Sequence, residues 1–254
     1  MSMRDLSGMR VALTRAQRQS EQSARDVFAH GGIPCVFPLL QFASTVNCTE
    51  VSTALDALRR GDVIAFTSEN GVQFSTSLVQ DSLMSAHRLG VRFAAVGERT
   101  AAALTASPLN IAPITPTGAQ SGAGLAHALL PYTAHGERVL ALGARQSRPE
   151  LTDVLRAAGR QVQSIAVYET QACDASELWA AILGDHIDAV VFASPSAVHA
   201  FVRDRSLALL PKRLIVACIG ETTRHQAEAS CLRVDVMPQT PTLTAVLAAL
   251  AAAP

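Results

Sequence analysis

Side-chain hydroxyls stand where apolar, strand-like runs of this sequence give way to helix-like runs. In open α/β sheets ligands bind at this edge, because helix N-termini there offer unpaired N–H groups and a partial positive charge. Carboxylates and phosphates suit such donors. A hydroxyl at this position can equally serve only as an N-cap, which stabilises a helix by about 1 kcal/mol. Five residues share the position: Ser68, Thr100, Ser194, Ser196 and Thr223.

Five arginines, Arg145 among them, and one tyrosine also lie near predicted strand ends. Arg15 and Arg148 are the best candidates for holding a carboxylate, since a guanidinium donates two parallel hydrogen bonds to it, although surface arginines without a ligand are common. Tyr168 ends a predicted strand, and its phenol can donate a proton to a leaving hydroxyl as a general acid. The alternative for Tyr168 is an amphipathic ring half-buried at a domain boundary.

Several common catalytic signatures are missing from the sequence. There is no G-x-x-x-x-G-K-[ST] phosphate loop, and the segment that begins at Gly118 fails the dinucleotide pattern because His127 replaces its last glycine. Neither a G-x-S-x-G elbow nor an H-E-x-x-H zinc motif occurs. The five cysteines lack zinc-type spacing and the seven histidines are scattered. We therefore expect no metal, no disulfide and no cofactor.

The elements that must position these residues alternate along almost the whole chain. Continuous apolar runs separated by helix-length segments are typical of parallel sheets covered on both faces, which predicts a doubly wound α/β fold. Gly31 and Gly159 stand where helix C-caps belong. The predicted strands are Arg10–Thr14, Pro34–Leu39, Asp62–Phe66, Arg92–Val96, Asn110–Ile114, Arg138–Leu142, Gln161–Tyr168, Asp188–Phe192, Leu214–Ile219 and Arg233–Val236. The predicted helices include Ser20–His30, Glu98–Ala106, Ser121–Leu130, Pro149–Ala158, Ser196–Arg205, Glu221–Ser230 and Thr242–Ala252.

An internal repeat predicts two similar lobes. Three pairs of segments resemble each other: Val63–Val72 with Ala189–Val198, Ala95–Thr100 with Cys218–Thr223, and Arg138–Ala141 with Arg10–Leu13. The last element of the middle unit thus matches the first element of the chain. We expect one continuous lobe over residues 41–165 and one discontinuous lobe over residues 1–38 plus 170–254. Two crossings predict a two-stranded β-ladder hinge and a cleft between the lobes, whereas duplication without a shared site is the alternative.

Composition limits the class of protein and its partners. A hydrophobic content of 49% is too high for a disordered chain. The 21 basic residues balance the 21 acidic ones without a basic block, which argues against nucleic-acid binding. No apolar run approaches the roughly 20 residues that span a bilayer, and the first residues lack a secretory signal. We expect a cytoplasmic protein with no nucleic-acid or membrane partner.

Ordered motifs over nearly the whole chain resemble the uroporphyrinogen-III synthase family. The chain departs from the family pattern at Ala16, where a proline usually follows Thr-Arg, and at Ala193, where a threonine usually precedes the serine. The matching segments are Leu13–Arg15, Ile33–Pro38, Phe66–Ser68 with Val72, Ala95–Ala101, Arg148–Leu151 through Gly159, Val167–Thr170, Phe192–Ser194 and Ile219–Thr223.

The resemblance implies a monomeric, cofactor-free lyase of heme biosynthesis with two α/β lobes joined by a β-ladder. Its implied substrate is hydroxymethylbilane, a linear tetrapyrrole with eight carboxylates. The implied reaction closes it to uroporphyrinogen III, with inversion of ring D and loss of water, through azafulvene and spiro intermediates. Tyr168 matches the family's cleft tyrosine and is the candidate general acid. The expected substrate-binding residues are Thr14, Arg15, Ser68, Thr100, Arg148, Ser194, Ser196 and Thr223.

Two other function classes remain open from the sequence. A non-catalytic two-lobe protein that binds or senses an anionic ligand needs the same fold and the same cleft. A glycosyltransferase with two doubly wound lobes normally needs a longer chain and a nucleotide site, and the sequence offers neither. An assay with hydroxymethylbilane separates the synthase from both.

Overall fold

The central strands of this protein are runs of aliphatic residues that are buried along their whole length. Val63–Phe66 and Ala189–Phe192 show no exposed position, as expected for parallel strands covered on both faces. The computed structural model describes residues 5–45 and 48–252. Within these ranges, nine strands and ten α-helices alternate along the chain.

The strands and helices have the following bounds. The strands are β1 (Arg10–Leu13), β2 (Ile33–Val36), β3 (Leu40–Ser44), β4 (Val63–Phe66), β5 (Arg92–Ala95), β6 (Arg138–Ala144), β7 (Gln161–Ala172), β8 (Ala189–Phe192) and β9 (Ile215–Cys218). The α-helices are α1 (Gln17–Ala29), α2 (Cys48–Asp56), α3 (Glu69–Leu89), α4 (Glu98–Ala106), α5 (Gly122–Leu129), α6 (Glu150–Ala157), α7 (Ser176–Leu183), α8 (Pro195–Val202), α9 (Glu221–Ala229) and α10 (Leu243–Ala252).

The chain folds into two compact units. Unit 1 consists of Met1–Gln41 and Gln171–Pro254, and unit 2 consists of Phe42–Thr170. The chain therefore passes from one unit to the other within β3 and again within β7. The hinge and the cleft that the sequence predicts between the lobes stay predictions.

Each unit is built on the same arrangement of parallel strands. One sheet has the order β2-β1-β8-β9, and the other contains β7-β6-β4-β5 with β3 added beside β7. The pairs β1–β2, β1–β8 and β8–β9 are parallel, and so are β6–β7, β4–β6 and β4–β5. The predicted α/β class with two similar parallel sheets is confirmed.

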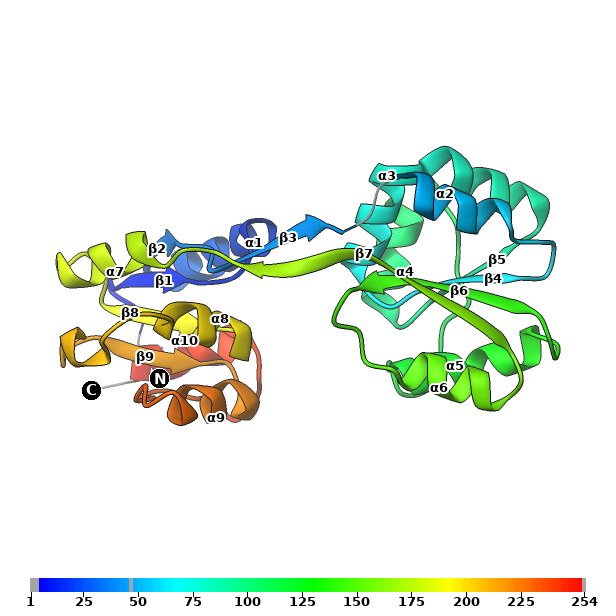
Figure 1. Ribbon diagram of the computed structural model, residues 1–254. Helices are drawn as coiled ribbons and strands as arrows, with labels where there is room; N and C mark the ends of the chain where they lie inside the picture. The colour runs from blue at the N-terminus through cyan, green and yellow to red at the C-terminus, as the bar shows by residue number, and fades with distance from the viewer. Residues whose placement is uncertain (1–4, 46–47, 253–254) are drawn as a thin grey trace. The chain divides into compact units, whose positions relative to one another are not determined.

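Helices cover both faces of the sheet in unit 2. In Figure 1, α2 and α3 lie over one face of the strands, and α5 and α6 lie over the other. One core cluster joins Leu83 of α3 to Phe66 of β4. A second cluster joins Leu125 of α5 and Leu155 of α6 to the opposite side of the same strands. Burial on both faces explains why these strands read as continuous apolar runs.

Unit 1 has the same two layers. Helices α7, α8 and α9 contribute to one core cluster, and α1 and α10 contribute to the other. Trp179 of α7 stacks on Phe201 of α8 with ring centroids 5.0 Å apart, and its indole N–H donates to the Phe201 carbonyl at 2.9 Å. Trp179 is therefore a core residue, as its apolar neighbours in the sequence predict.

Two of the predicted strands are wrong. Within 110–114 only Ile114 forms an isolated bridge, to Ala94, and within 233–236 only Val236 does so, to Ala217. Proline explains the first case, because Pro113 has no N–H to donate to a ladder. The structure also adds β3, a short strand that the sequence pattern does not indicate.

Two glycines end matching helices in the two units. Gly31 follows α1 with φ of 80°, and Gly159 follows α6 with φ of 77°. The residue after each donates its backbone N–H to a carbonyl near the helix end, Gly32 to Val27 at 3.1 Å and Arg160 to Leu155 at 3.0 Å. This left-handed conformation favours glycine, so both predicted C-caps are confirmed.

Candidate functional site

A β-bulge decides where Tyr168 points. In the β6–β7 pair, Gly143 lies opposite Ala166 and Ala144 lies opposite Tyr168, which leaves Val167 as an extra residue. Successive side chains of a regular strand point to opposite faces of the sheet. At a bulge, the extra residue and the residue after it can point to the same face. Val167 and Tyr168 accordingly pack in the same core cluster of unit 2, beneath α2 and α3.

The ring of Tyr168 is held by two phenylalanines. Phe74 of α3 stacks on it with centroids 5.4 Å apart and planes 15° apart, and Phe42 of β3 meets its edge at 5.7 Å and 86°. The residue is only 6% exposed. Neither phenylalanine is a candidate from the sequence, since nothing in their spacing marks them as neighbours of a tyrosine about a hundred residues away.

The phenol oxygen of Tyr168 lies 3.0 Å from the hydroxyl of Ser68, within hydrogen-bond distance. Ser68 is the N-cap of α3, with extended backbone angles, and its Oγ accepts the Gly71 N–H at 3.0 Å. Two residues that the sequence placed at separate strand ends are thus brought together. The pair stands at the positive end of a helix, where developing negative charge is stabilised.

The matching serine of unit 1 has the cap but no tyrosine. Ser194 is the N-cap of α8 and accepts the Ala197 N–H at 3.3 Å. Ser194 is half-buried, and Ser196 is exposed on the first turn of the helix. Both hydroxyls stand at a helix N-terminus that follows a central strand, as the sequence predicts, and their contact with a substrate stays a prediction.

The three threonines predicted to bind substrate are all buried in this structure. Thr14 is fully buried, and its hydroxyl donates to the Val191 carbonyl of the neighbouring strand at 2.7 Å. Thr100 and Thr223 are 4% and 1% exposed in the first turns of α4 and α9. Neither Thr100 nor Thr223 caps its helix, because Gly97 and Gly220 hold the N-cap positions. Contact of the three threonines with a substrate stays a prediction.

The arginines near strand ends differ in their surroundings. Arg148 is exposed in the loop between β6 and α6, and it forms no ion pair with any residue in 5–45 or 48–252. Arg15 follows β1 and is half-buried. Arg145, which the sequence ranks lower, pairs with Glu169 at 2.7 Å and donates its backbone N–H to the Tyr168 carbonyl at 2.8 Å.

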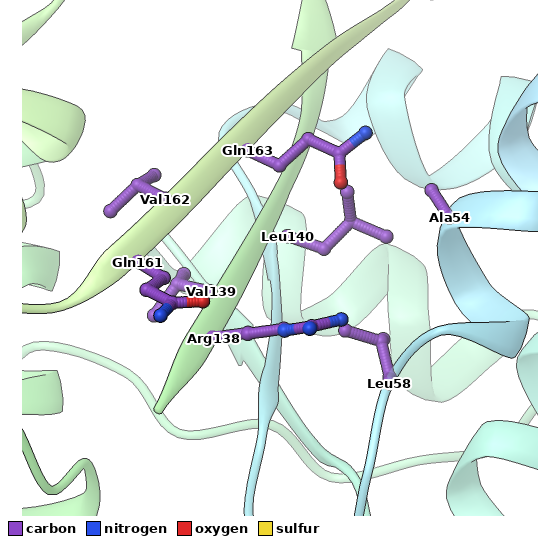
Figure 2. Close-up of a pocket in the computed structure, with 8 residues that line it drawn as sticks. All are labelled: Ala54, Leu58, Arg138, Val139, Leu140, Gln161, Val162 and Gln163. Carbon is purple, nitrogen blue, oxygen red and sulfur yellow. The ribbon is translucent and has the colours of Figure 1, made fainter. Parts of the chain in front are cut away.

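A pocket of about 230 Å³ lies in unit 2 at the opposite edge of the sheet from Tyr168. Figure 2 shows its polar lining, which includes Arg138 and Gln163, and its apolar lining, which includes Leu140 and Ala54. Arg138 and Gln161 begin β6 and β7, whereas Ser68 lies just beyond the end of β4 and Tyr168 lies in the second half of β7. Parallel strands place these two groups at opposite edges, so this pocket is separate from the hydroxyl pair.

The cysteines are free thiols, and three of them have raised pKa values, which makes them less reactive. Burial raises the pKa of Cys218 to about 12 and also raises the pKa values of Cys35 and Cys173. These thiols are protonated at neutral pH and are poor nucleophiles.

Across the described residues, no three His, Cys, Asp or Glu side chains gather as a metal site would require. No described helix has both the length and the apolar character needed to cross a bilayer.

Two proteins of similar sequence carry names from porphyrin biosynthesis. The porphyrin biosynthesis protein HemD of Ruminiclostridium josui is 24% identical over 232 residues, which are 90% of this chain but 45% of that protein. The chain thus spans less than half of that relative. A protein of Methanothermobacter thermautotrophicus, provisionally named a uroporphyrinogen-III synthase, is 28% identical over 252 residues, or 95% of this chain and 97% of that protein.

A solved structure and a family model agree with these relatives. The uroporphyrinogen-III synthetase of Helicobacter pylori 26695 superposes with a TM-score of 0.61 at 18% identity, covering 94% of this chain and 96% of that one, which supports the fold. The family model described as uroporphyrinogen-III synthase HemD matches residues 21–248, most of the chain. This chain belongs to the uroporphyrinogen-III synthase family.

Proposed function

We propose that this protein is an active uroporphyrinogen-III synthase, which closes hydroxymethylbilane to uroporphyrinogen III with loss of water. The observation that carries the proposal is the pairing of Tyr168 with Ser68 at the N-terminus of α3, 3.0 Å apart, in a chain of this family. An acid is needed to turn the terminal hydroxyl of the bilane into water, and a phenol beside a helix N-terminus can supply the proton.

In the proposed reaction, Tyr168 donates its phenolic proton to the terminal hydroxyl of the bilane. That hydroxyl leaves as water, and the remaining tetrapyrrole is an azafulvene cation. The substituted position of ring D then attacks this cation to form a spiro intermediate, which fragments and recloses with ring D inverted. Re-aromatisation releases one proton, which returns to the phenolate, so one water is lost overall and the enzyme is restored.

The protein's main task in this proposal is to hold the substrate in one shape. Unaided cyclisation gives the type I isomer, so selectivity must come from positioning and electrostatic stabilisation rather than from a nucleophile. Eight substrate carboxylates need donors, and the side chains proposed to supply them are the accessible ones at the strand ends. These are Arg15, Arg148, Ser194 and Ser196, together with the backbone N–H groups of α3 and α8.

The proposal also covers partners and assembly. We propose that the protein acts as a monomer on a small anionic substrate, with neither a metal nor an organic cofactor taking part in the reaction. Its balanced charge of 21 basic and 21 acidic residues fits a local anion site better than a broad nucleic-acid surface.

The test is an assay with freshly generated hydroxymethylbilane in which type I and type III uroporphyrinogen are separated. We expect the type III isomer to be the main product, and to form faster than the type I isomer forms in buffer alone. Only type I product at the uncatalysed rate would reject the synthase and leave the non-catalytic binding protein. In that case, binding of the bilane measured by fluorescence quenching would decide whether the family's ligand is retained.

A further inference from the structure

The hydrogen bond between Ser68 and Tyr168 can run in either direction, because each side chain carries a hydroxyl proton. Ser68 Oγ already accepts the Gly71 N–H at 3.0 Å, and it lies 3.0 Å from Tyr168 Oη. Either oxygen can donate across the pair. When Ser68 donates, the phenolic proton stays free to point at a ligand. When Tyr168 donates, its proton is occupied and cannot protonate a substrate.

The helix favours the first of these arrangements. A hydrogen bond accepted by a hydroxyl strengthens that hydroxyl as a donor and weakens it as a further acceptor. The Gly71 N–H has this effect on Ser68, and the partial positive charge at the N-terminus of α3 adds to it. Ser68 is therefore the better donor of the pair, and Tyr168 is the better acceptor.

The aromatic contacts hold the phenol ring, and the hydrogen bond from Ser68 directs its proton. Phe74 stacks on the ring of Tyr168 and Phe42 meets its edge, and these contacts support the position of the ring and of Oη beside Ser68. When Oη accepts from the Ser68 hydroxyl, the phenolic proton must point in a different direction from Ser68.

We infer that Ser68 is a positioning residue that acts through Tyr168, rather than a ligand of a substrate carboxylate. Ser68 donates to Oη, which aims the phenolic proton away from α3. When that proton passes to the leaving hydroxyl, its electron pair stays on Oη, and the bond from Ser68 becomes a stronger, charge-assisted one. This role rests on the proposed synthase function.

Steady-state kinetics separates positioning from carboxylate binding. We expect Ser68→Ala to lower kcat about tenfold with KM unchanged, because one hydrogen bond to the reacting group is lost. Ser68→Thr keeps the hydroxyl and should restore most of kcat. In a Tyr168→Phe background, Ser68→Ala should lower kcat no further. A raised KM at unchanged kcat would instead make Ser68 a substrate ligand and overturn the inference.

Ser121→Ala is the matched control for loss of a helix cap. Ser121 caps α5 in the same unit and accepts the Gly124 N–H at 3.1 Å, but no tyrosine is bonded to it. We expect Ser121→Ala to lower the melting temperature about as much as Ser68→Ala while leaving kcat unchanged. If both variants lose kcat equally, then Ser68 only caps its helix, and the inference is wrong.

The hydrogen bond between Ser68 and Tyr168 can also be tested by NMR without substrate, independently of the synthase assay. The chain has two tyrosines, so ¹³C labelling of the phenolic carbon gives two NMR signals, with exposed Tyr132 as the internal reference. We expect Ser68→Ala, but not Ser121→Ala, to move the Tyr168 signal. An unmoved signal would overturn the inference even in an active enzyme. A moved signal with only type I product would reject the synthase, and with it the role of Ser68.

Discussion

The two units share one scaffold and differ at the ends of their strands. Both have four parallel strands in the same order, and both cap a helix with a serine, Ser68 in unit 2 and Ser194 in unit 1. Both bury a threonine in the first turn of a later helix, Thr100 or Thr223. Repetition of these features indicates that they serve the fold.

The difference lies beside the capping serine. The spacing that relates Arg10 to Arg138 and Gly31 to Gly159 also relates Leu40 to Tyr168. The β1–β2 register runs regularly from Arg10 to Leu13, whereas the β6–β7 register shifts just before Tyr168. A serine alone can only cap its helix or accept a ligand, but a serine with a phenol can also deliver a proton. The proposed proton transfer therefore belongs to unit 2, whereas both units are proposed to bind substrate carboxylates.

Replacement of the phenol should have the largest effect on activity. We expect Tyr168→Phe to lower the rate of uroporphyrinogen III formation by about 10²–10⁴-fold, the usual contribution of a general acid. Tyr132→Phe is the control, since that ring is 49% exposed and lies outside the pair. Full activity of Tyr168→Phe would mean that unit 2 has no chemical role that unit 1 lacks.

The two cores should respond alike to loss of a buried ring. Phe66 and Phe192 occupy matching strands, and both are fully buried. We expect Phe66→Ala and Phe192→Ala each to lower the free energy of unfolding by about 3–5 kcal/mol, measured by denaturant titration. Phe28→Ala, at a site 75% exposed, should cost little. A difference of more than about 2 kcal/mol between the two core variants would show that the repeated cores are not equivalent.

The matching C-cap glycines should respond unequally to alanine. Both have positive φ, so alanine at either position costs about 1 kcal/mol. A Cβ at Gly159 would also lie 2.4 Å from the ring of His135, whereas at Gly31 the nearest atom, in the Asp5 side chain, is 3.3 Å away. We expect a larger drop in melting temperature for Gly159→Ala. Gly118→Ala, with no atom within 4 Å, is the control, and equal drops would contradict the expectation.

An ion pair at the start of β1 in unit 1 should make a small, pH-dependent contribution to the free energy of unfolding. Arg10 binds Asp188 at 2.6 Å, and this contact lowers the pKa of Asp188 below 3.8. The carboxylate therefore stabilises the fold above pH 3.8, and this contribution disappears as the pH falls through the lower, folded-state pKa. We expect Asp188→Asn to cost about 1 kcal/mol at pH 7, after solvent screening, and less at pH 2, where more of the carboxylate is protonated.

Urea titrations at pH 7 and pH 2 measure this difference directly. Asp62 is the counterpart in unit 2, where it accepts the backbone N–H of Arg138 at 2.9 Å. The Arg138 guanidinium instead donates to the Ala57 carbonyl. If Asp188→Asn lowered the free energy of unfolding equally at both pH values, the assigned role of the ion pair would be contradicted.

Local patterns were sufficient to predict most of the fold. The alternation of apolar runs and helix-length segments indicates two parallel sheets, and the repeated Phe66–Ser68 and Phe192–Ser194 segments indicate where each strand meets a capped helix. Ladder pairing at 110–114 and 233–236 was overestimated, because an apolar run does not reveal how many of its N–H groups find a partner. Prediction of β3 failed for a different reason, since Leu40–Ser44 has no fully buried position and so lacks the continuous apolar run of the central strands.

By itself, the sequence determined the α/β class, the repeat, the capping serines and the motifs of the family. Only the tertiary structure decided that Thr14 is buried behind a neighbouring strand and that Tyr168 faces Ser68. The reason is that one extra residue, Val167, moves a side chain to the other face of a sheet. Such a bulge leaves no mark in composition or periodicity, because it is set by how β7 pairs with β6.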